Sequence, residues 1–256
     1  MRLVIDTDVK TLTVENDGKT QLLDLYSKEA FEVVSQQWIR IGWDQKYPYT
    51  FSWMGRPIIQ LPEDMIRIQE AIYQLKPDVI IETGIAHGGS LIFYSSICKA
   101  IGKGRVIGVD VDIRQHNRDA IEEHELFDRI TLIEGCSVSN EVVSQVKGLI
   151  EPADKVLVVL DSKHTYEHVY KELESYSKFV TAGSYIVATD GVMVDLVGVP
   201  RGHSNWKLDN PKCAAEDFVK NTPKFVIEQP VWPFNESELD QNVTHWPSAW
   251  LRRVSN

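Results

Sequence analysis

The stretch DVIIETGIAHGGSLIFY, residues 78–94, decides the fold. It begins with an apolar run that ends on an acid, Glu82, and continues into a bend that contains Gly84, Gly88 and Gly89. A short and continuously apolar run is typical of a strand that is buried on both faces. Glycine allows a tight turn and a close approach to the backbone. The stretch therefore predicts a strand, a tight loop and a helix, with a binding crevice where the strand ends.

The same alternation continues along the chain. Apolar runs predict strands at residues 78–83, 105–110, 130–135, 155–161 and 184–190, and helical patterns follow the first four of them at 89–102, 113–126, 140–150 and 166–180. Strands that alternate with helices indicate a doubly wound, mostly parallel sheet. With edge strands expected at 224–228 and 249–254, we predict a Rossmann-like α/β fold with a seven-stranded sheet.

The first 62 residues follow another pattern. Apolar residues recur at helical spacing over residues 21–39, and residues 43–62, WDQKYPYTFSWMGRPIIQLP, break all periodicity and predict a long ordered loop rich in aromatic residues. A further helix is expected at 63–77. We therefore predict an N-terminal extension at 1–62, a helix plus an aromatic loop that serves as a substrate lid or an oligomer contact. The ligand-binding domain is expected at 63–256.

Composition narrows the function. The chain has a formal net charge of −10, which argues against a nucleic-acid backbone or an anionic membrane as partner. Its three cysteines, Cys98, Cys136 and Cys213, are too few and too widely spaced for a disulfide framework or a zinc ribbon. A reducing cytoplasm is the expected compartment. The N-terminus lacks the apolar stretch of a signal peptide, and no run reaches the length of a membrane span.

Each predicted strand of the parallel sheet ends on or next to an acid. These residues are Glu82, Asp110, Glu134, Asp161 and Asp190. Ligands of open parallel sheets bind at the carboxyl ends of the strands. Acids are also common there as helix caps, but five acids in equivalent positions favour a shared site.

The loop after the first strand indicates the ligand. ETGIAHGGS is not G-x-G-x-x-G, which disfavours a dinucleotide, while Asp110 is placed to bind the hydroxyls of a ribose. A nucleoside without pyrophosphate, such as S-adenosylmethionine (SAM), fits this combination, with its adenine near Cys136. The expected cofactor-binding residues are Glu82, Thr83, Gly84, Gly88, Ser90, Asp110, Asp112, Gly135, Cys136, Ser137 and Asp161.

Several segments in order carry a family resemblance. They are residues 49–97 around the glycine loop, GRVIGVDVDIRQHN at 104–117, ITLIEGCSVS at 130–139, LDSKHTYEHVYKEL at 160–173 and NVTHWPSAWLRRV at 242–254. Over roughly residues 45–255 the chain resembles the cephalosporin hydroxylase family of class I SAM-dependent methyltransferases, which includes rhamnosyl O-methyltransferases. The resemblance implies methyl transfer to a hydroxyl of a sugar or other small molecule of secondary metabolism, such as an antibiotic intermediate. It also implies a homo-oligomer.

The resemblance further implies a magnesium site and a base. Asp161 and Asp190 are the implied metal ligands, and His164 occupies the general-base position of the family, so that His164 and Asp161 are the expected catalytic residues. The family often places two adjacent ligands after the fifth strand, whereas here Thr189 and Gly191 flank Asp190. This difference leaves open where a third ligand comes from, whether metal binds at all, and whether His164 is itself a ligand.

Two other function classes remain open at this point. HTYEH, residues 164–168, matches the H-x-x-E-H zinc pattern, so a metal-dependent hydrolase or hydroxylase would use Asp161, His164 and His168. Neither a hydrolase nor a hydroxylase explains the glycine loop or Asp110. A catalytically reduced SAM-binding protein would explain both, together with the missing second acid beside Asp190.

Overall fold

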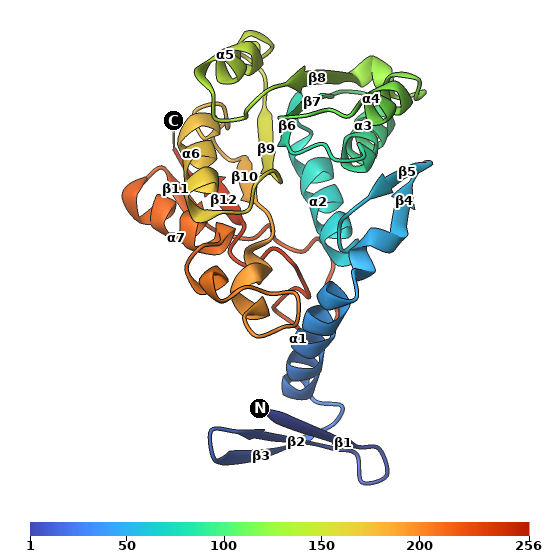
Figure 1. Ribbon diagram of the computed structural model, residues 1–256, viewed down its shortest axis with the longest axis vertical. Coiled ribbons are helices and arrows are strands. Elements are labelled where there is room, and N and C mark those ends of the chain that lie inside the picture. Colours follow the sequence, from blue (N-terminus) through green and yellow to red (C-terminus); the bar gives the residue numbers. More distant parts are fainter. Residues whose placement is uncertain (256) are drawn as a thin grey trace.

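The computed structural model describes residues 1–255, and its centre is a seven-stranded sheet (Figure 1). The strand order is β11-β12-β10-β9-β6-β7-β8. The strands are β6 (Val79–Thr83), β7 (Arg105–Asp110), β8 (Ile130–Glu134), β9 (Val156–Leu160), β10 (Tyr185–Ala188), β11 (Phe225–Ile227) and β12 (Trp250–Arg253). All neighbours pair in parallel except β12, which is antiparallel to β10 and β11. The predicted doubly wound, mostly parallel fold is confirmed.

Helices cover both faces of this sheet (Figure 1). One face carries α2 (Pro62–Leu75), α3 (Gly89–Ile101) and α4 (Gln115–Glu122), and the other carries α5 (Asn140–Gly148), α6 (Tyr166–Tyr176) and α7 (Pro211–Asn221). Successive strand residues point to opposite faces. In β6, Ile80 packs in the first core, while Val79 and Ile81 pack in the second. Burial on both sides explains why the strand sequences are continuously apolar.

The strand order reverses between β6 and β9. From β6 the chain adds β7 and β8 on one side, and then returns to place β9 and β10 on the other. The loops after β6 and β9 therefore lie side by side, and the Asp161 amide donates a hydrogen bond to the Thr83 carbonyl at 2.8 Å. Gly84 has a φ of +91°, and a Cβ there would collide with the Asp161 carbonyl. This glycine is required for the two loops to approach, and crevices at such reversal points bind ligands.

The N-terminal region differs from the sequence prediction. Strands β1 (Arg2–Asp6), β2 (Thr11–Asn16) and β3 (Lys19–Asp24) form a separate antiparallel sheet at the end of α1 (Lys28–Asp44), away from the main body (Figure 1). The helix predicted at 21–39 was wrong at its start. Asp17 and Gly18 have φ values of 49° and 75°, as in a tight hairpin turn, and β3 pairs with β2 instead. Ser27 begins the helix because its Oγ accepts a hydrogen bond from the Ala30 amide.

The aromatic segment is more regular than the predicted loop. After the short helix η1 (Tyr47–Thr50), strands β4 (Phe51–Trp53) and β5 (Arg56–Ile58) form a hairpin. The hairpin lies over α3, where the Trp53 indole donates to Ser96 Oγ at 3.1 Å. A Cβ at Gly89 would collide with the Pro57 carbonyl, so this glycine lets the hairpin approach the start of α3.

The C-terminal third also contains structure that the sequence pattern did not predict. Besides α7 it has the short helices η3 (Gly191–Leu196) and η4 (Ser204–Lys207). In the middle of the chain, a further short helix, η2 (Phe127–Arg129), precedes β8. The edge strands β11 and β12 lie where they were predicted. Within residues 1–255, no helix combines the length and the apolar character that crossing a membrane requires.

Candidate active site

A cavity of about 410 Å³ opens at the carboxyl ends of β6, β7 and β9. Its volume falls within the range of small-molecule sites. The lining residues come from β5 and the segment after it, from the loops after β6, β7, β8 and β9, and from α3 and α6: Pro57, Ile58, Ile59, Gln60, Gly84, Ile85, Ala86, His87, Gly89, Ser90, Val109, Asp110, Val111, Cys136, Ser137, Asp161, Ser162, Lys163 and His168.

Asp110 anchors the glycine loop from the end of β7. Its Oδ2 accepts hydrogen bonds from the amides of Ile85 at 2.7 Å and Ala86 at 3.2 Å. Its Oδ1 accepts from the Asp112 amide at 3.2 Å. Ala86 has a φ of 47°, a left-handed conformation that costs an L residue about 1–2 kcal/mol. The carboxylate therefore stabilises a loop shape that the backbone would not adopt unaided.

Two further side chains hold the same loop from its outer side. The Arg56 guanidinium donates to the His87 carbonyl at 2.6 and 3.0 Å and to Asn117 Oδ1 at 3.1 Å. Asn117 in turn donates to the Ala86 carbonyl at 2.9 Å. The loop is thus fixed by β5, β7 and α4 together, and its free surface faces the cavity. Such a loop is preorganised for binding.

Glu82, the acid at the end of β6, lies beneath the cavity rather than in its wall. Its side chain is fully buried, and Ser90 Oγ donates to its Oε2 at 2.5 Å. Burial, and then the charge of Asp161, raise the pKa of Glu82 well above its ordinary value. Glu82 contributes to the site by fixing Ser90, which does line the cavity.

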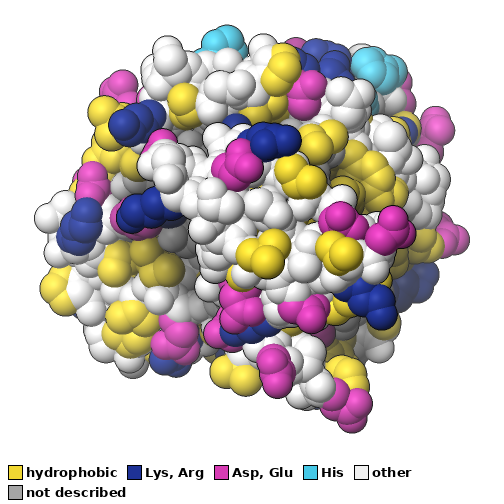
Figure 2. Space-filling view, turned by 90° about the horizontal axis from the view of Figure 1, so that it is seen from below, with side chains coloured by type: hydrophobic (Ala, Val, Ile, Leu, Met, Phe, Trp, Pro, Cys, Tyr) yellow, Lys and Arg dark blue, Asp and Glu magenta, His cyan; other side chains and the backbone are white. Residues whose placement is uncertain are grey.

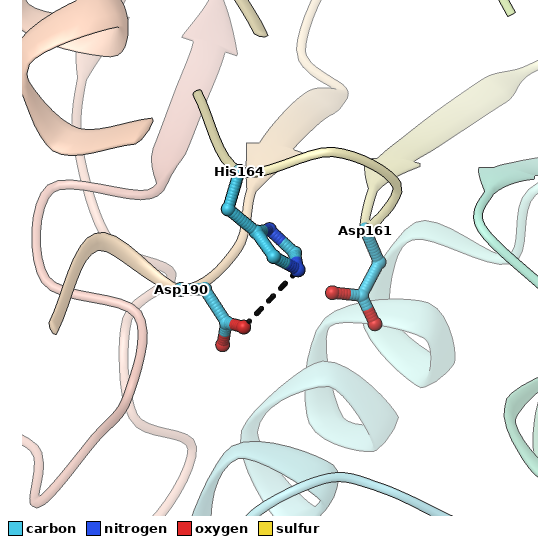
Figure 3. Close-up of side chains that lie close together, drawn as sticks. All are labelled: Asp161, His164 and Asp190. Atoms are coloured by element: carbon cyan, nitrogen blue, oxygen red, sulfur yellow. Dashed lines mark ion pairs between the residues drawn. The ribbon is translucent and has the colours of Figure 1, made fainter. Parts of the chain in front are cut away.

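Asp161, His164 and Asp190 converge beside this cavity (Figure 3). One potential ligand atom from each lies within 4.8 Å of the others, and His164 Nε2 is 3.3 Å from Asp190 Oδ2. Asp161 and His164 come from the loop between β9 and α6, and Asp190 follows β10 in a left-handed conformation with φ 57°. Two carboxylates and an imidazole around one point can hold a divalent cation.

The electrostatics of this cluster favour a bound cation or a proton. Burial and the neighbouring Asp190 raise the pKa of Asp161 to about 6. Thr189 Oγ1 lies 2.6 Å from Asp161 Oδ1 and fixes that carboxylate. Two nearby carboxylates destabilise each other when both are ionised. A divalent cation would remove this repulsion.

The structure excludes an acid at Gly191, one of the two positions that flank Asp190. A Cβ at Gly191 would lie 2.5 Å from the Pro247 carbonyl and 3.2 Å from Lys212 Cβ. An aspartate at this position would collide with the backbone of the C-terminal segment. Within the described residues, His164 is the other group that lies close to both Asp161 and Asp190.

A buried acid supports this region from behind. Asp64 of α2 accepts hydrogen bonds from the Thr244 hydroxyl and, at 2.8 Å, from the His245 amide. Burial raises the pKa of Asp64 to about 8. The His245 carbonyl accepts from the Val192 amide at 3.0 Å, which ties the C-terminal segment to η3, the element that follows Asp190. Burial also lowers the pKa of the His245 imidazole, and the charge of Asp190 opposes that effect.

The predicted site residues fall into two groups. The structure brings Gly84, Ser90, Asp110, Cys136, Ser137 and Asp161 into the cavity wall. The remaining predicted cofactor-binding residues do not line the cavity: Glu82, Thr83, Gly88, Asp112 and Gly135. Thr83 is fully buried, a Cβ at Gly88 would meet the Ile121 side chain, and the Asp112 side chain is exposed. Glu134 is paired with Asp110 in the sheet register, but its carboxylate forms an exposed ion pair with Arg118 at 2.9 Å and does not line the cavity.

The structure separates the two histidines of the HTYEH stretch. His164 precedes α6 and contacts Asp190, whereas His168 lies on α6 with Nε2 3.1 Å from Ser137 Oγ. His168 is not part of the cluster formed by Asp161, His164 and Asp190. The arrangement required by the hydrolase or hydroxylase alternative, with His168 as a ligand, is not supported.

Sequence reasoning missed the contribution of β5 to the cavity. Pro57, Ile58, Ile59 and Gln60 form one wall, whereas the sequence pattern predicts a loop at these positions. The sequence signal that could have revealed the hairpin is Gly55. It follows Met54 in the turn, where the two residues have φ values of 45° and 85°. Lys163 and His87 also line the cavity, and no pattern in the sequence distinguishes them from exposed loop residues.

The model of the family "Rhamnosyl O-methyltransferase/CmcI" matches residues 45–254, which is most of the chain. The chain belongs to this family. The resemblance inferred from the sequence segments is thereby confirmed.

Relatives of known function share part of this length. A rhamnosyl O-methyltransferase of Mycobacterium leprae is 31% identical over 143 residues, 55% of this chain and 60% of that protein. One from Mycobacterium bovis is 28% identical over 141 residues, 54% of this chain and 56% of that protein. The chain therefore spans less than two thirds of the length of the curated relatives that it matches.

Solved structures agree with the fold. A CmcI structure with Mg and SAM covers 81% of this chain and 78% of its own at 16% identity, with a TM-score of 0.54. A caffeoyl-CoA O-methyltransferase structure from Staphylococcus aureus covers 78% of this chain and 91% of its own at 15% identity, with a TM-score of 0.51. At these identities the similarity supports the methyltransferase fold alone.

Proposed function

We propose that the protein is a SAM-dependent O-methyltransferase that acts, with the assistance of Mg²⁺, on a hydroxyl of a sugar or other small molecule of secondary metabolism. The observation that carries the proposal is the position of Asp161. This residue lines the cavity beside the glycine loop and also belongs to the cluster with His164 and Asp190. A methyl donor in the cavity and an acceptor at the cluster would therefore be adjacent, as in-line transfer requires.

The cavity residues would hold the donor. We assign the SAM site to the lining residues Gly84, Ser90, Asp110, Cys136, Ser137 and Asp161, with Glu82 and Thr83 beneath them. Gly88, Asp112 and Gly135 shape the loops around this site without lining the cavity. SAM, when bound, supplies a methyl group that is already activated on a sulfonium. With a donor bound, the anchored loop would exclude water from one side of it and hold it beside Asp161.

The cluster residues fit a magnesium ion. Asp161 and Asp190 offer the oxygen atoms that Mg²⁺ prefers, and the space between the ligands leaves positions for water or acceptor oxygens. A bound Mg²⁺ would lower the pKa of an acceptor hydroxyl. The M. leprae and M. bovis relatives are rhamnosyl O-methyltransferases, which supports a sugar hydroxyl as the acceptor.

His164 is the residue we assign as general base. Its Nε2 is 3.3 Å from Asp190 Oδ2, so the carboxylate orients the ring and stabilises the imidazolium that forms. In this assignment His164 takes the acceptor proton as the methyl group is transferred, and Asp161 and Asp190 keep the acceptor oxygen in place. A ligand role for His164 is the alternative that measurement must distinguish.

We also propose that residues 1–62 form an extension to the SAM-binding domain at 63–256. In this proposal the protein self-associates through that extension. On α1, the side chains of Phe31, Trp38 and Ile41 are 45%, 40% and 63% exposed and follow helix-pairing spacing. Figure 2 looks onto the end of the molecule that carries the N-terminal sheet, where apolar patches lie among charged side chains. Trp38→Glu should shift the protein to a smaller species in analytical ultracentrifugation; an unchanged mass would contradict self-association through α1.

We propose a cytoplasmic location, supported by the three free cysteine thiols.

The methyltransferase assignment is tested by binding and turnover. Calorimetry should detect S-adenosylhomocysteine binding, and transfer of a labelled methyl group from SAM to rhamnosylated acceptors should depend on Mg²⁺ and stop with EDTA. Binding without turnover on any hydroxylated acceptor would favour the reduced SAM-binding alternative. Absence of S-adenosylhomocysteine binding would refute the assignment.

A further inference from the structure

Two residues of α6, His168 and Glu172, have no role in the reaction described so far, although both contact Ser137 in the cavity wall. Glu172 of α6 is fully buried, and its Oε1 lies 2.6 Å from Ser137 Oγ and 2.7 Å from Ser162 Oγ. His168, one helical turn earlier, has Nε2 3.1 Å from Ser137 Oγ and 3.4 Å from Glu172 Oε1. Ser137, Ser162 and His168 line the cavity, and Glu172 lies behind them.

The distances determine where the protons lie. Two hydroxyl groups approach the same carboxylate oxygen, so each serine donates its one proton to Glu172. Ser137 Oγ then has only acceptor capacity left for His168. Nε2 of His168 must therefore carry the hydrogen that bonds to Ser137. In a neutral imidazole with the hydrogen on Nε2, the other nitrogen, Nδ1, is a bare acceptor.

This acceptor has no partner within the described part of the protein. Among residues 1–255 the hydrogen bonds of the His168 ring involve Nε2 and none involves Nδ1, and the residue lines the cavity. Glu172 Oε2 is also buried without a hydrogen-bond partner in this part of the chain. A buried polar group without a partner is uncommon in a native protein, and it points to a ligand or water that completes the group.

We propose that Glu172, acting through Ser137, holds His168 in the tautomer whose Nδ1 accepts a hydrogen bond from the exocyclic amine of a 6-aminopurine base. The proposal rests on the proposed function, in which a nucleoside occupies this cavity. His168 is then the residue that selects adenosine ligands, and Glu172 and Ser137 are positioning residues. A 6-oxopurine presents a carbonyl at the same place, where two acceptors would meet and neither would be satisfied.

The two serines provide a matched pair of variants. Both donate to the same oxygen of Glu172, and both line the cavity, but only Ser137 is bonded to His168. Ser137→Ala breaks the connection between the carboxylate and the histidine. Ser162→Ala removes an equivalent hydroxyl and leaves that connection intact. If Glu172 served only to stabilise the fold, the two variants would behave alike.

The experiment compares two ligands that differ at one purine substituent. Affinities of S-adenosylhomocysteine and its deamination product, S-inosylhomocysteine, are measured by calorimetry for the wild-type chain and both variants. The wild type should bind the adenosine compound about 10- to 100-fold more tightly. Ser137→Ala should reduce this ratio to below about threefold, while Ser162→Ala keeps it. Glu172→Gln should change the ratio in the same direction as Ser137→Ala, because an amide can donate to Ser137 and release its proton to His168.

Each outcome decides a different point. Tight S-adenosylhomocysteine binding with equal ratios in both serine variants, whether high or low, overturns the selection by His168 but leaves the proposed function intact. A wild-type preference for S-inosylhomocysteine also overturns it, because Nδ1 would then be a donor. If neither compound binds to the wild type, the proposed function fails first, and this inference fails with it.

Discussion

Replacing Asp110 by alanine should lower the affinity for S-adenosylhomocysteine by about a hundredfold. The Asp110 carboxylate accepts hydrogen bonds from the amides of Ile85 and Ala86 at 2.7 and 3.2 Å. A hydrogen bond to a charged group contributes about 1.5–3 kcal/mol. We use the lower limit because Asp110 is partly exposed, which gives about 3 kcal/mol for the pair. If binding must restore the loop, this free energy corresponds to about a factor of 100 in the dissociation constant.

Calorimetry of wild type and Asp110→Ala with S-adenosylhomocysteine measures this factor. Asp112→Ala is the matched control, since Asp112 lies two residues further along and its exposed side chain does not line the cavity. Hydrogen exchange without ligand separates anchoring from direct contact: the amides of Ile85 and Ala86 should exchange much faster in Asp110→Ala. Affinity within threefold of wild type, or unchanged exchange at both amides, would refute the reasoning.

Three further predictions concern the cluster and its support. His164→Ala should reduce turnover by about 10²–10⁴-fold while Mg²⁺ and S-adenosylhomocysteine affinities stay within a few-fold; loss of Mg²⁺ binding in calorimetry would instead make His164 a ligand. Because the pKa of Asp161 is about 6, protons should compete with Mg²⁺, and the calorimetric affinity should be constant above pH 7 and fall below about pH 6. The pKa of Asp64 is about 8, against an ordinary value of 3.8, so the folded chain holds this proton more tightly than the unfolded chain. Its contribution to stability is therefore greatest below about pH 4 and is lost as the pH rises to about 8; Asp64→Asn should flatten this part of the pH dependence in urea unfolding, and an unchanged slope would contradict the assignment.

Much of the fold could be predicted because strands buried on both faces have continuously apolar sequences. The run Val79–Thr83 is buried on both faces, and such runs are visible as continuous apolar sequence. The N-terminal hairpins were missed for the opposite reason. Their strands are largely exposed and mixed in composition, so only turn residues such as Asp17 and Gly18 signal them.

The candidate site was predictable where acidic residues stand at the carboxyl ends of strands. Asp110, Asp161 and Asp190 end strands of one sheet, and topology alone brings such ends together. The exact partners were not predictable. Asp110 was expected to bind ribose, but its carboxylate is used at least partly by the loop amides. Glu134 occupies an equivalent position on β8 and faces Arg118 on the surface, since a sequence does not show which way the last side chain of a strand points.

The C-terminal segment limits which residues can follow Asp190 at the candidate metal site. Its Pro247 carbonyl occupies the space that a side chain at position 191 would need. The same segment is fixed from below by the bonds of Thr244 and His245 to Asp64, and it holds η3 through the Val192 amide. An acid at position 191 is therefore excluded, and the other neighbour of Asp190, Thr189, donates a hydrogen bond to Asp161. A cation at this site would depend on Asp161, Asp190 and solvent or acceptor oxygens, with His164 close enough to act on whatever the cation binds.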